Sequence, residues 1–203
     1  MSIIGQLREF TEGPWTGIRI IKTNIAASGP PMRLCEAIAR SFDQPLLLPS
    51  YELSCPGARR SFGLDGDDRS LSTTISQTTG VPATKIRTIL VGRPKLSKPV
   101  AGLKLGEIED PEVVVGYVRP LAAMKLLRLW QSRFGGNLTV SLSTFLSICS
   151  SVAGVILKPR LVYSLGCPNS REVGGLPPDS VAAILPTKLA RVLLEGSAGH
   201  ANV

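Results

Sequence analysis

The chain contains two similar segments, and each of them carries two cysteines. The first segment begins at Cys35 and includes Cys55, and the second begins at Cys149 and includes Cys167. Chance agreement of short Pro, Gly and Cys patterns is one explanation, but the shared order and spacing favour a duplication, which predicts two related structural units. With one gap of two residues, the further identities are Ala39 and Ala153, Pro45 and Pro159, Leu47 and Leu161, Ser50 and Ser164, Leu53 and Leu165, Pro56 and Pro168, Arg59 and Arg171, Gly63 and Gly175, Leu64 and Leu176, and Asp67 and Asp179.

The two units are expected to form one globular domain spanning residues 1–203, a length that can bury a well-packed core. The internal repeat covers residues 16–95 and 110–196, and Pro and Gly cluster near the boundary at 93–99. We expect the halves to pack about a pseudo-twofold axis. An axis of this kind would bring the two matching cysteine pairs together.

Apolar runs typical of strands alternate with amphipathic runs typical of helices. Strands are expected at 16–22, 113–118, 138–142 and 181–185, and helices at 30–42, 121–134, from about 144 or 149 to 157, and at 187–194. The polar stretch 70–80, rich in Ser and Thr, is predicted to be a loop or an exposed edge. This alternation predicts an α/β (or α+β) fold with a mixed sheet and helices.

The chain is basic, with a net charge of +8, and six Lys and Arg residues lie between 85 and 104. Aromatic residues are only 5% of the chain, and none interrupts that run. Proteins that bind single-stranded nucleic acids normally supply aromatic stacking platforms. We therefore expect a solvated basic face that suits a redox or acidic protein partner or an anionic ligand, with RNA binding as the less favoured alternative. A homodimer is compatible with the sequence, which leaves the oligomeric state open.

No stretch approaches the 18–20 apolar residues that a spanning helix needs, and the first residues lack the pattern of a secretory signal. We expect a cytoplasmic protein that does not associate with membranes. In a reducing compartment, four cysteines indicate free thiols, catalysis or metal binding rather than a disulfide framework.

One cysteine of each half stands directly before a proline, in Cys55-Pro56 and Cys167-Pro168. Proline suits the first position of a helix, which places each of these cysteines at or near an N-cap. Unpaired N–H groups and partial positive charge at a helix N-terminus stabilise a thiolate. The thiolate is the form that binds metals.

The spacing of the cysteines identifies no particular metal. Structural zinc sites typically use short C-x2–4-C knuckles, whereas 19 residues separate Cys35 from Cys55 and 17 separate Cys149 from Cys167. Ferredoxin-type spacing is also absent. Duplication is the stronger signal, because four thiolates at one centre suit a cubane [4Fe-4S] cluster or a tetrahedral ion. Three interpretations stay open: an iron–sulfur cluster held by all four cysteines, a zinc ion, and cysteines without a ligand.

Five other residues are candidates for a pocket beside the cysteines. Arg59 and Arg171 follow their cysteines by four residues and would face an anionic ligand or cover a helix surface. Gly174 and Gly175 would let the backbone approach closely or serve as ordinary turn residues. Glu36 adjoins Cys35 and would line the pocket or form a surface salt bridge.

The chain resembles an uncharacterised prokaryotic family, the domain of unknown function 169. The stretches that carry the resemblance are PMRLCEAIA, LSCPGARRSFGL, DPEVVVGYVRPLAAMKLL, ICSSVAG and LGCPNSREVGGLPPDSVAAILP. The resemblance implies a four-cysteine protein frequent in anaerobic archaea and bacteria, and it favours an oxygen-sensitive iron–sulfur cluster without naming a substrate. Asn169 departs from the family pattern, in which a small Ser or Gly is usual.

Several catalytic classes do not fit the sequence. The single histidine, His200, lies in a Gly- and Ala-rich tail, which argues against Ser–His–Asp or Cys–His catalysis. Neither a P-loop nor a G-x-G-x-x-G motif is present. The favoured function is a redox or sulfur-handling iron–sulfur protein, and whether it is an enzyme stays open. The alternative is a non-enzymatic adaptor, or a module that binds RNA or an anionic ligand, with zinc or free cysteines.

Overall fold

A computed structural model describes residues 1–23, 25–26, 29–64, 67–135 and 147–195. These residues form an α/β fold with one six-stranded sheet, as the sequence predicts. The order across the sheet is β2-β3-β1-β4-β6-β5. The strands are β1 (Trp15–Ile21), β2 (Leu46–Pro49), β3 (Gly102–Gly106), β4 (Val113–Val118), β5 (Val162–Ser164) and β6 (Val181–Pro186).

All neighbouring strands of this sheet pair antiparallel, so the expectation of a mixed sheet is wrong for the described strands. Each half contributes three adjacent strands: β2-β3-β1 from the first half and β5-β6-β4 from the second. The innermost strands, β1 and β4, pair antiparallel at the centre, with Thr16 opposite Val115. The second, third and first strands of each set thus take matching places in the sheet, and the pseudo-twofold relation stays a prediction.

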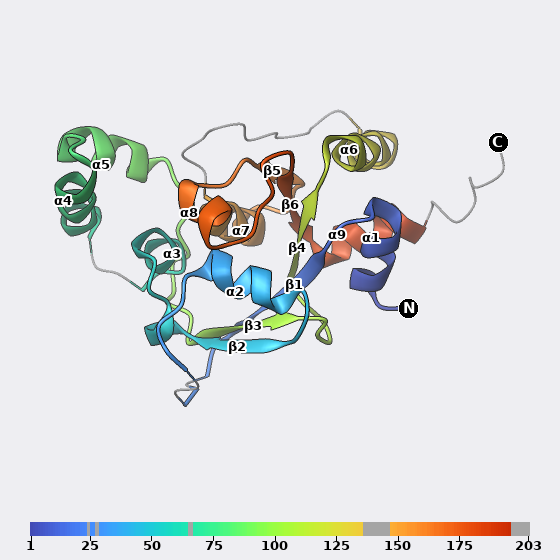
Figure 1. Cartoon of the computed structure of the whole chain (residues 1–203), viewed down its shortest axis with the longest axis horizontal. Helices are drawn as coiled ribbons and strands as arrows, with labels where there is room; N and C mark the ends of the chain where they lie inside the picture. The colour runs from blue at the N-terminus through green and yellow to red at the C-terminus, as the bar shows by residue number, and fades with distance from the viewer. Residues whose placement is uncertain (24, 27–28, 65–66, 136–146, 196–203) are drawn as a thin grey trace.

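Helices cover both faces of the sheet (Figure 1). Side chains alternate between the two faces along β4, because successive residues of a strand point in opposite directions. Val113, Val115 and Tyr117 join one core cluster, and Val114 and Val118 join the other. The helices are α1 (Ile3–Thr11), α2 (Leu34–Ser41), α3 (Pro56–Ser61), α4 (Asp68–Thr79), α5 (Ala83–Val91), α6 (Pro120–Phe134), α7 (Ile148–Leu157), α8 (Pro168–Glu172) and α9 (Thr187–Glu195), with a 3-10 turn at Ser50–Glu52.

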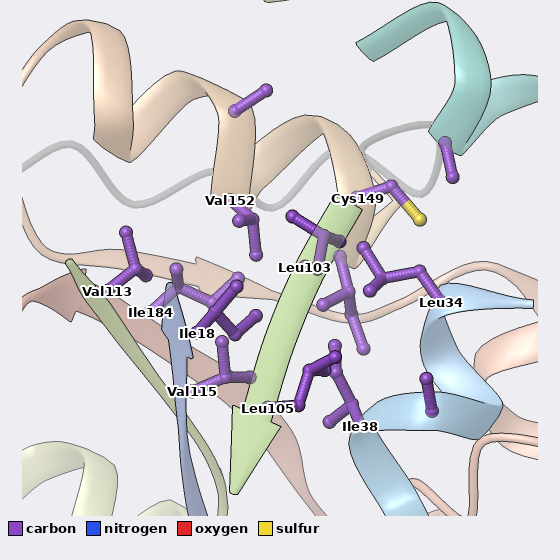
Figure 2. Close-up of a cluster of buried hydrophobic side chains, with 14 of the residues drawn as sticks. Ile18, Leu34, Ile38, Leu103, Leu105, Val113, Val115, Cys149, Val152 and Ile184 are labelled. Atoms are coloured by element: carbon purple, nitrogen blue, oxygen red, sulfur yellow. The ribbon is translucent and has the colours of Figure 1, made fainter. Parts of the chain in front are cut away.

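The cysteine-bearing helices lie on one face. Helices α2 and α7 bury Leu34, Ile38 and Val152 against β1, β3 and β4, and α3 packs at their N-terminal side (Figure 2). Helices α1, α6 and α9 cover the opposite face, where Trp15 and Leu126 are fully buried. The sheet therefore sets α2 and α7, one from each half, side by side over a shared core.

The segment 70–80 is a helix, α4, and the prediction of a loop or exposed edge there is wrong. Asp67 caps the helix, because its carboxylate accepts a hydrogen bond from the Ser70 N–H, and Gly80 ends it with a left-handed φ of 70°. Leu71 packs with Ile86 and Leu90 of α5. The Ser- and Thr-rich composition of α4 resembles that of a loop, although the segment is a solvent-exposed helix. Together α4 and α5 form a helical hairpin that projects from the sheet (Figure 1).

Most other predicted elements are close to those observed. The helix expected from residue 30 begins at Leu34, and the helix expected from about 144 or 149 begins at Ile148, after the Ser147 cap. Helix α1 and strands β2, β3 and β5 were not foreseen, and the predicted strand 138–142 lies outside the described residues. Among the helices that the structure describes, none is long and apolar enough to cross a bilayer.

Candidate functional site

Cys55 is the N-cap residue of α3, where the sequence places it. Its backbone is extended, with φ −77° and ψ 120°, and Pro56 takes the first helical turn. The pKa of Cys55 is lowered from 9.0 to about 6, chiefly by a hydrogen bond with the Cys149 side chain. Burial opposes this shift, while the N–H groups of Ala58 and Gly57 and the charge of Arg33 add to it. Cys55 is therefore the thiolate of the site at neutral pH.

Cys149 is the second residue of α7, and only 4% of it is exposed. Ser147 fixes the start of this helix by accepting a hydrogen bond from the Ser150 N–H. The pKa of Cys149 is raised well above 9.0, first by its hydrogen bond to Cys55, then by burial and by the charges of Cys55, Cys35 and Cys167. The hydrogen bond therefore favours the thiolate on Cys55 and the thiol on Cys149.

Cys35 takes the matching position in the first half, as the second residue of α2, and is also 4% exposed. Its pKa is raised to about 11 by burial, and then by the charges of Cys167 and Cys55. The N–H groups of Glu36 and Cys35 itself act in the opposite direction. The cysteine whose charge affects Cys35 most is therefore one from the other half of the chain.

Cys167 directly precedes α8, as predicted, and is half-buried. Its sulfur lies 3.4 Å from the Ser170 hydroxyl, and its carbonyl accepts a hydrogen bond from the Ser170 N–H at 2.9 Å. The couplings join a helix cysteine of one half to a loop cysteine of the other: Cys149 with Cys55, and Cys35 with Cys167. The charges of cysteines from one half therefore act on cysteines of the other half.

The sequence leaves three states of the cysteines open: an iron–sulfur cluster, a zinc ion, or no ligand. A single tetrahedral zinc ion, with Zn–S bonds near 2.3 Å, holds its four sulfurs roughly 3.8 Å apart. Among the described residues, no three Cys, His, Asp or Glu side chains are grouped closely enough to hold one ion.

Gly174 lies close against the N-terminal turn of α2, with no room there for a side chain. A Cβ added there would lie 2.8 Å from the Cys35 Cβ and 2.7 Å from the Ser170 carbonyl oxygen. Gly175 has a left-handed φ of 60°, and its repeat partner Gly63 has a φ of 75°. The turn after α8 therefore holds Cys35 beside the second half.

The charged pocket candidates form local contacts within their own half. Glu36 forms an i,i+4 salt bridge with Arg40 at 2.6 Å, which is the surface role considered from the sequence. Arg59 donates to the carbonyl of Leu53 at 3.3 Å, and Arg171 donates to that of Leu165 at 2.9 Å. Leu53 and Leu165 are matched in the repeat, so both arginines brace the loop that precedes the cysteine of their own half.

Tyr117 of β4 is a site residue that sequence reasoning missed. Its hydroxyl donates a hydrogen bond to the Gly174 carbonyl at 2.8 Å, and its ring packs edge-on against Phe42 at 4.9 Å. Burial raises its pKa, and the charges of Cys35, Cys149 and Cys167 raise it further. Only its position in a buried strand could have drawn attention to it, since it lies far from every cysteine in the sequence.

Two arginines that interact electrostatically with the cysteines were also missed as site residues. Arg33 precedes α2, and its charge lowers the pKa of Cys55. Arg93 lies between α5 and β3, and its charge interacts with Cys167 and Cys149. The sequence placed Arg93 in the basic run and at the boundary between halves. Its distance along the chain from either cysteine hid this role.

The sequence was also compared with protein families and with known proteins. Residues 15–196 match a family described as an uncharacterised ArCR, a span that includes all four cysteines. The chain belongs to the family called domain of unknown function 169. No curated protein and no solved structure matches it. Membership of the domain of unknown function 169 family thus agrees with the resemblance seen in the sequence and leaves the activity to be argued from the site.

Proposed function

We propose that this protein binds an iron–sulfur cluster, of the [4Fe-4S] type, through Cys35, Cys55, Cys149 and Cys167, and serves in electron transfer or sulfur handling. The observation that carries the proposal is the coupling of the four thiols across the two halves. Cysteines kept only for packing have no need to gather at one place, where each raises the cost of ionising the next.

The surroundings of the cysteines supply what a negatively charged thiolate centre needs. The N–H groups of Gly57 and Ala58 point at the Cys55 sulfur, and those of Cys35 and Glu36 act on the Cys35 sulfur. Hydrogen bonds and positive charge of this kind stabilise bound thiolates and tune the potential of a cluster. The arginines Arg33 and Arg93 add positive charge on the Cys55 side and on the Cys167 side.

Cys55 and Cys149 would each hold the cluster through sulfur in place of their hydrogen bond, with release of the Cys149 proton to solvent. A cluster bound in this way would supply one-electron redox chemistry. Four protein ligands would occupy every iron and favour electron transfer or a structural role, whereas three would leave one iron open for a substrate. Seryl variants distinguish these cases, because a dispensable cysteine leaves the cluster in place.

The proposal includes the cellular setting and partners. All four cysteines are free thiols, as expected in the reducing cytoplasm, where we place this protein. A partner would be a redox protein with an acidic docking surface, because the chain carries a net charge of +8. The alternative is an adaptor, or a module for RNA or an anionic ligand, with zinc or no metal at the cysteines.

The test is anaerobic purification of the full chain, followed by its visible spectrum and by iron and acid-labile sulfide analysis. The proposal predicts a broad absorption band together with iron and sulfide in equal amounts. The Ser54→Ala variant, at an exposed residue next to Cys55, is the matched control and should load as the wild type does. Stoichiometric zinc without sulfide, or a folded colourless protein that takes up no iron from iron and sulfide under reducing conditions, would refute it.

A further inference from the structure

A cavity of about 410 Å³ lies at the C-terminal end of α7, whereas Cys149 lies at the N-terminal end of that helix. Leu157, the last residue of α7, lines this α7 cavity together with Ile20 of β1 and with Leu96 and Val100 of the segment that leads into β3. Its volume falls within the roughly 300–1,000 Å³ that is typical of small-molecule sites. The α7 cavity is therefore a candidate binding site separate from the cysteines.

Backbone hydrogen bonds hold the walls of the α7 cavity in place. The Leu96 N–H donates to the Ser61 carbonyl at 2.9 Å, and the Ala101 N–H donates to the Ile21 carbonyl at 2.9 Å. Gly63 has a left-handed φ of 75°, and a Cβ added there would lie 2.9 Å from the Leu96 carbonyl oxygen. The segment between α5 and β3 is thus fixed to the end of α3 and to the end of β1, so the cavity is a pre-formed part of the fold.

The inner surface of the α7 cavity is apolar. Leu96 and Val100 are buried members of the core cluster that contains α7, and Ile20 packs against that cluster. Leu157 is 52% exposed, which leaves an apolar wall open to solvent at the end of the helix. An apolar group that filled the cavity would remove this surface from water, and that burial favours binding.

Two lysines line the open side of the α7 cavity. Lys22 follows β1, Lys98 lies in the segment before β3, and both are exposed. Among the described residues, no Asp or Glu lines the cavity, and neither lysine forms an ion pair. Two ammonium groups at one cavity create a positive potential that attracts an anion.

We propose that the α7 cavity binds a small amphipathic anion, a monocarboxylate with an apolar body. The carboxylate would lie at Lys22 and Lys98, and the apolar body would cover Ile20 and Leu157. Charge alone would suit any anion, and an apolar lining alone would suit any apolar molecule, so the two together define this class of ligand. The inference goes beyond the proposed cluster, because it uses no cysteine and no iron.

The test is isothermal titration calorimetry of the iron-free full chain, purified with a chelator and a reductant and checked for folding by circular dichroism. Octanoate carries both the charge and the apolar body, 1-octanol has a similar chain without the charge, and acetate has the charge without the chain. Octanoate should bind at one saturable site. Octanol should bind roughly threefold or more weakly, because it forms no charge interaction with the lysines, and acetate should show no detectable binding.

The charge requirement is tested by the double variant Lys22→Gln/Lys98→Gln. Its affinity for octanoate should fall by roughly threefold or more, while its affinity for octanol stays the same. The matched control is Lys125→Gln/Lys188→Gln, which removes two exposed lysines from α6 and α9 on the opposite face of the sheet. This control should bind octanoate as the wild type does.

The apolar requirement is tested by Leu157→Ala. Both octanoate and octanol should bind roughly threefold or more weakly to this variant, because part of the apolar wall is lost. Leu121→Ala is the matched control, since Leu121 is an exposed leucine of α6, which covers the other face. It should leave both affinities unchanged.

Absence of saturable octanoate binding would overturn the inference, and so would equal affinities of the wild type for octanol and octanoate. An equal fall in the two double lysine variants would also overturn it, because it would reflect net charge only. The wild-type affinity for octanoate must decrease as salt rises, and a salt-independent affinity would count against the inference even if a variant failed to fold. Absence of iron from the native protein would refute the cluster alone, since these measurements use iron-free chain.

Discussion

The thiol of Cys149 is hydrogen-bonded to the sulfur of Cys55, although the two residues belong to opposite halves of the chain. The contact joins the N-terminal turn of α7 to the N-cap of α3, and these two helices pack against each other. Figure 2 shows the Cys149 sulfur at the edge of the buried core, directed toward α3. The pair links the packing of the two halves to the chemistry of the site.

Replacing Cys149 with alanine should raise the pKa of Cys55 from about 6 toward 9.0, because the largest influence that lowers it is lost. The fraction of Cys55 thiolate at pH 7 then falls, and its alkylation by iodoacetamide slows in the iron-free protein. The pH dependence of that rate gives the pKa directly. Cys149→Ser keeps a donor and should restore a lower value, and an equal midpoint in wild type and Cys149→Ala would contradict the hydrogen bond.

Gly174→Ala should destabilise the fold by roughly 1–3 kcal/mol, the usual cost of forcing an extra group into a packed site. The new Cβ would lie 2.8 Å from the Cys35 Cβ and 2.7 Å from the Ser170 carbonyl oxygen, and backbone cannot move aside cheaply. Urea unfolding measures the change. Gly92→Ala is the control, because its nearest neighbour would be 4.0 Å away. Equal stability of the two variants would show that the turn is not tightly packed against α2.

Arg59→Met and Arg171→Met should each cost roughly 1–3 kcal/mol of unfolding free energy, since each arginine donates two hydrogen bonds to backbone carbonyls. Both side chains donate to the loop before a cysteine, at matched positions of the repeat. Methionine keeps much of the apolar stem and removes only the donors. The exposed Arg87→Met serves as the control. A loss in one half only would argue that the two arginines have different roles.

Asp68→Asn should weaken the attachment of the α4–α5 hairpin, because it leaves the buried Arg60 without its carboxylate. The pKa of Asp68 is lowered in the folded protein, first by its hydrogen bond from Arg60. A carboxyl group whose pKa is lowered by folding stabilises the folded state at pH values above its unfolded-state pKa, near 3.8. This stabilisation disappears as the pH falls through the folded-state pKa.

At pH 7, the Asp68→Asn variant is therefore expected to lose about 1–3 kcal/mol of unfolding free energy. Below the folded pKa, it should match the wild type. Denaturant titrations at both pH values measure this difference. The exposed Asp43→Asn should change little at either pH. A loss that persisted unchanged in acid would assign the effect to packing rather than to the ion pair.

The sequence predicts much of this architecture because the duplicated cysteine segments are local patterns. Cys55-Pro56 and Cys167-Pro168 identify two helix starts, and the buried strand at 113–118 is evident from its continuous apolar run. Helix α4 was missed because its Ser and Thr side chains resemble a loop, while its few apolar residues pack only against α5.

The rest of the site depends on long-range contacts that no local pattern reveals. Tyr117 reaches Gly174 across the core, and Arg60 of α3 holds the backbone of Arg93, which lies far from it in the sequence. Arg59 and Arg171, which the repeat makes equivalent, donate to equivalent loop carbonyls, those of Leu53 and Leu165.

The central claim is that cysteines from both halves serve one centre. Iron and sulfide content of the four single Cys→Ser variants, prepared anaerobically beside Ser54→Ala, tests it most directly. We predict a loss of cluster when a cysteine is replaced in either half, from Cys35 or Cys55 as well as from Cys149 or Cys167. Full iron and sulfide in both variants of one half, with loss confined to the other, would contradict a shared centre.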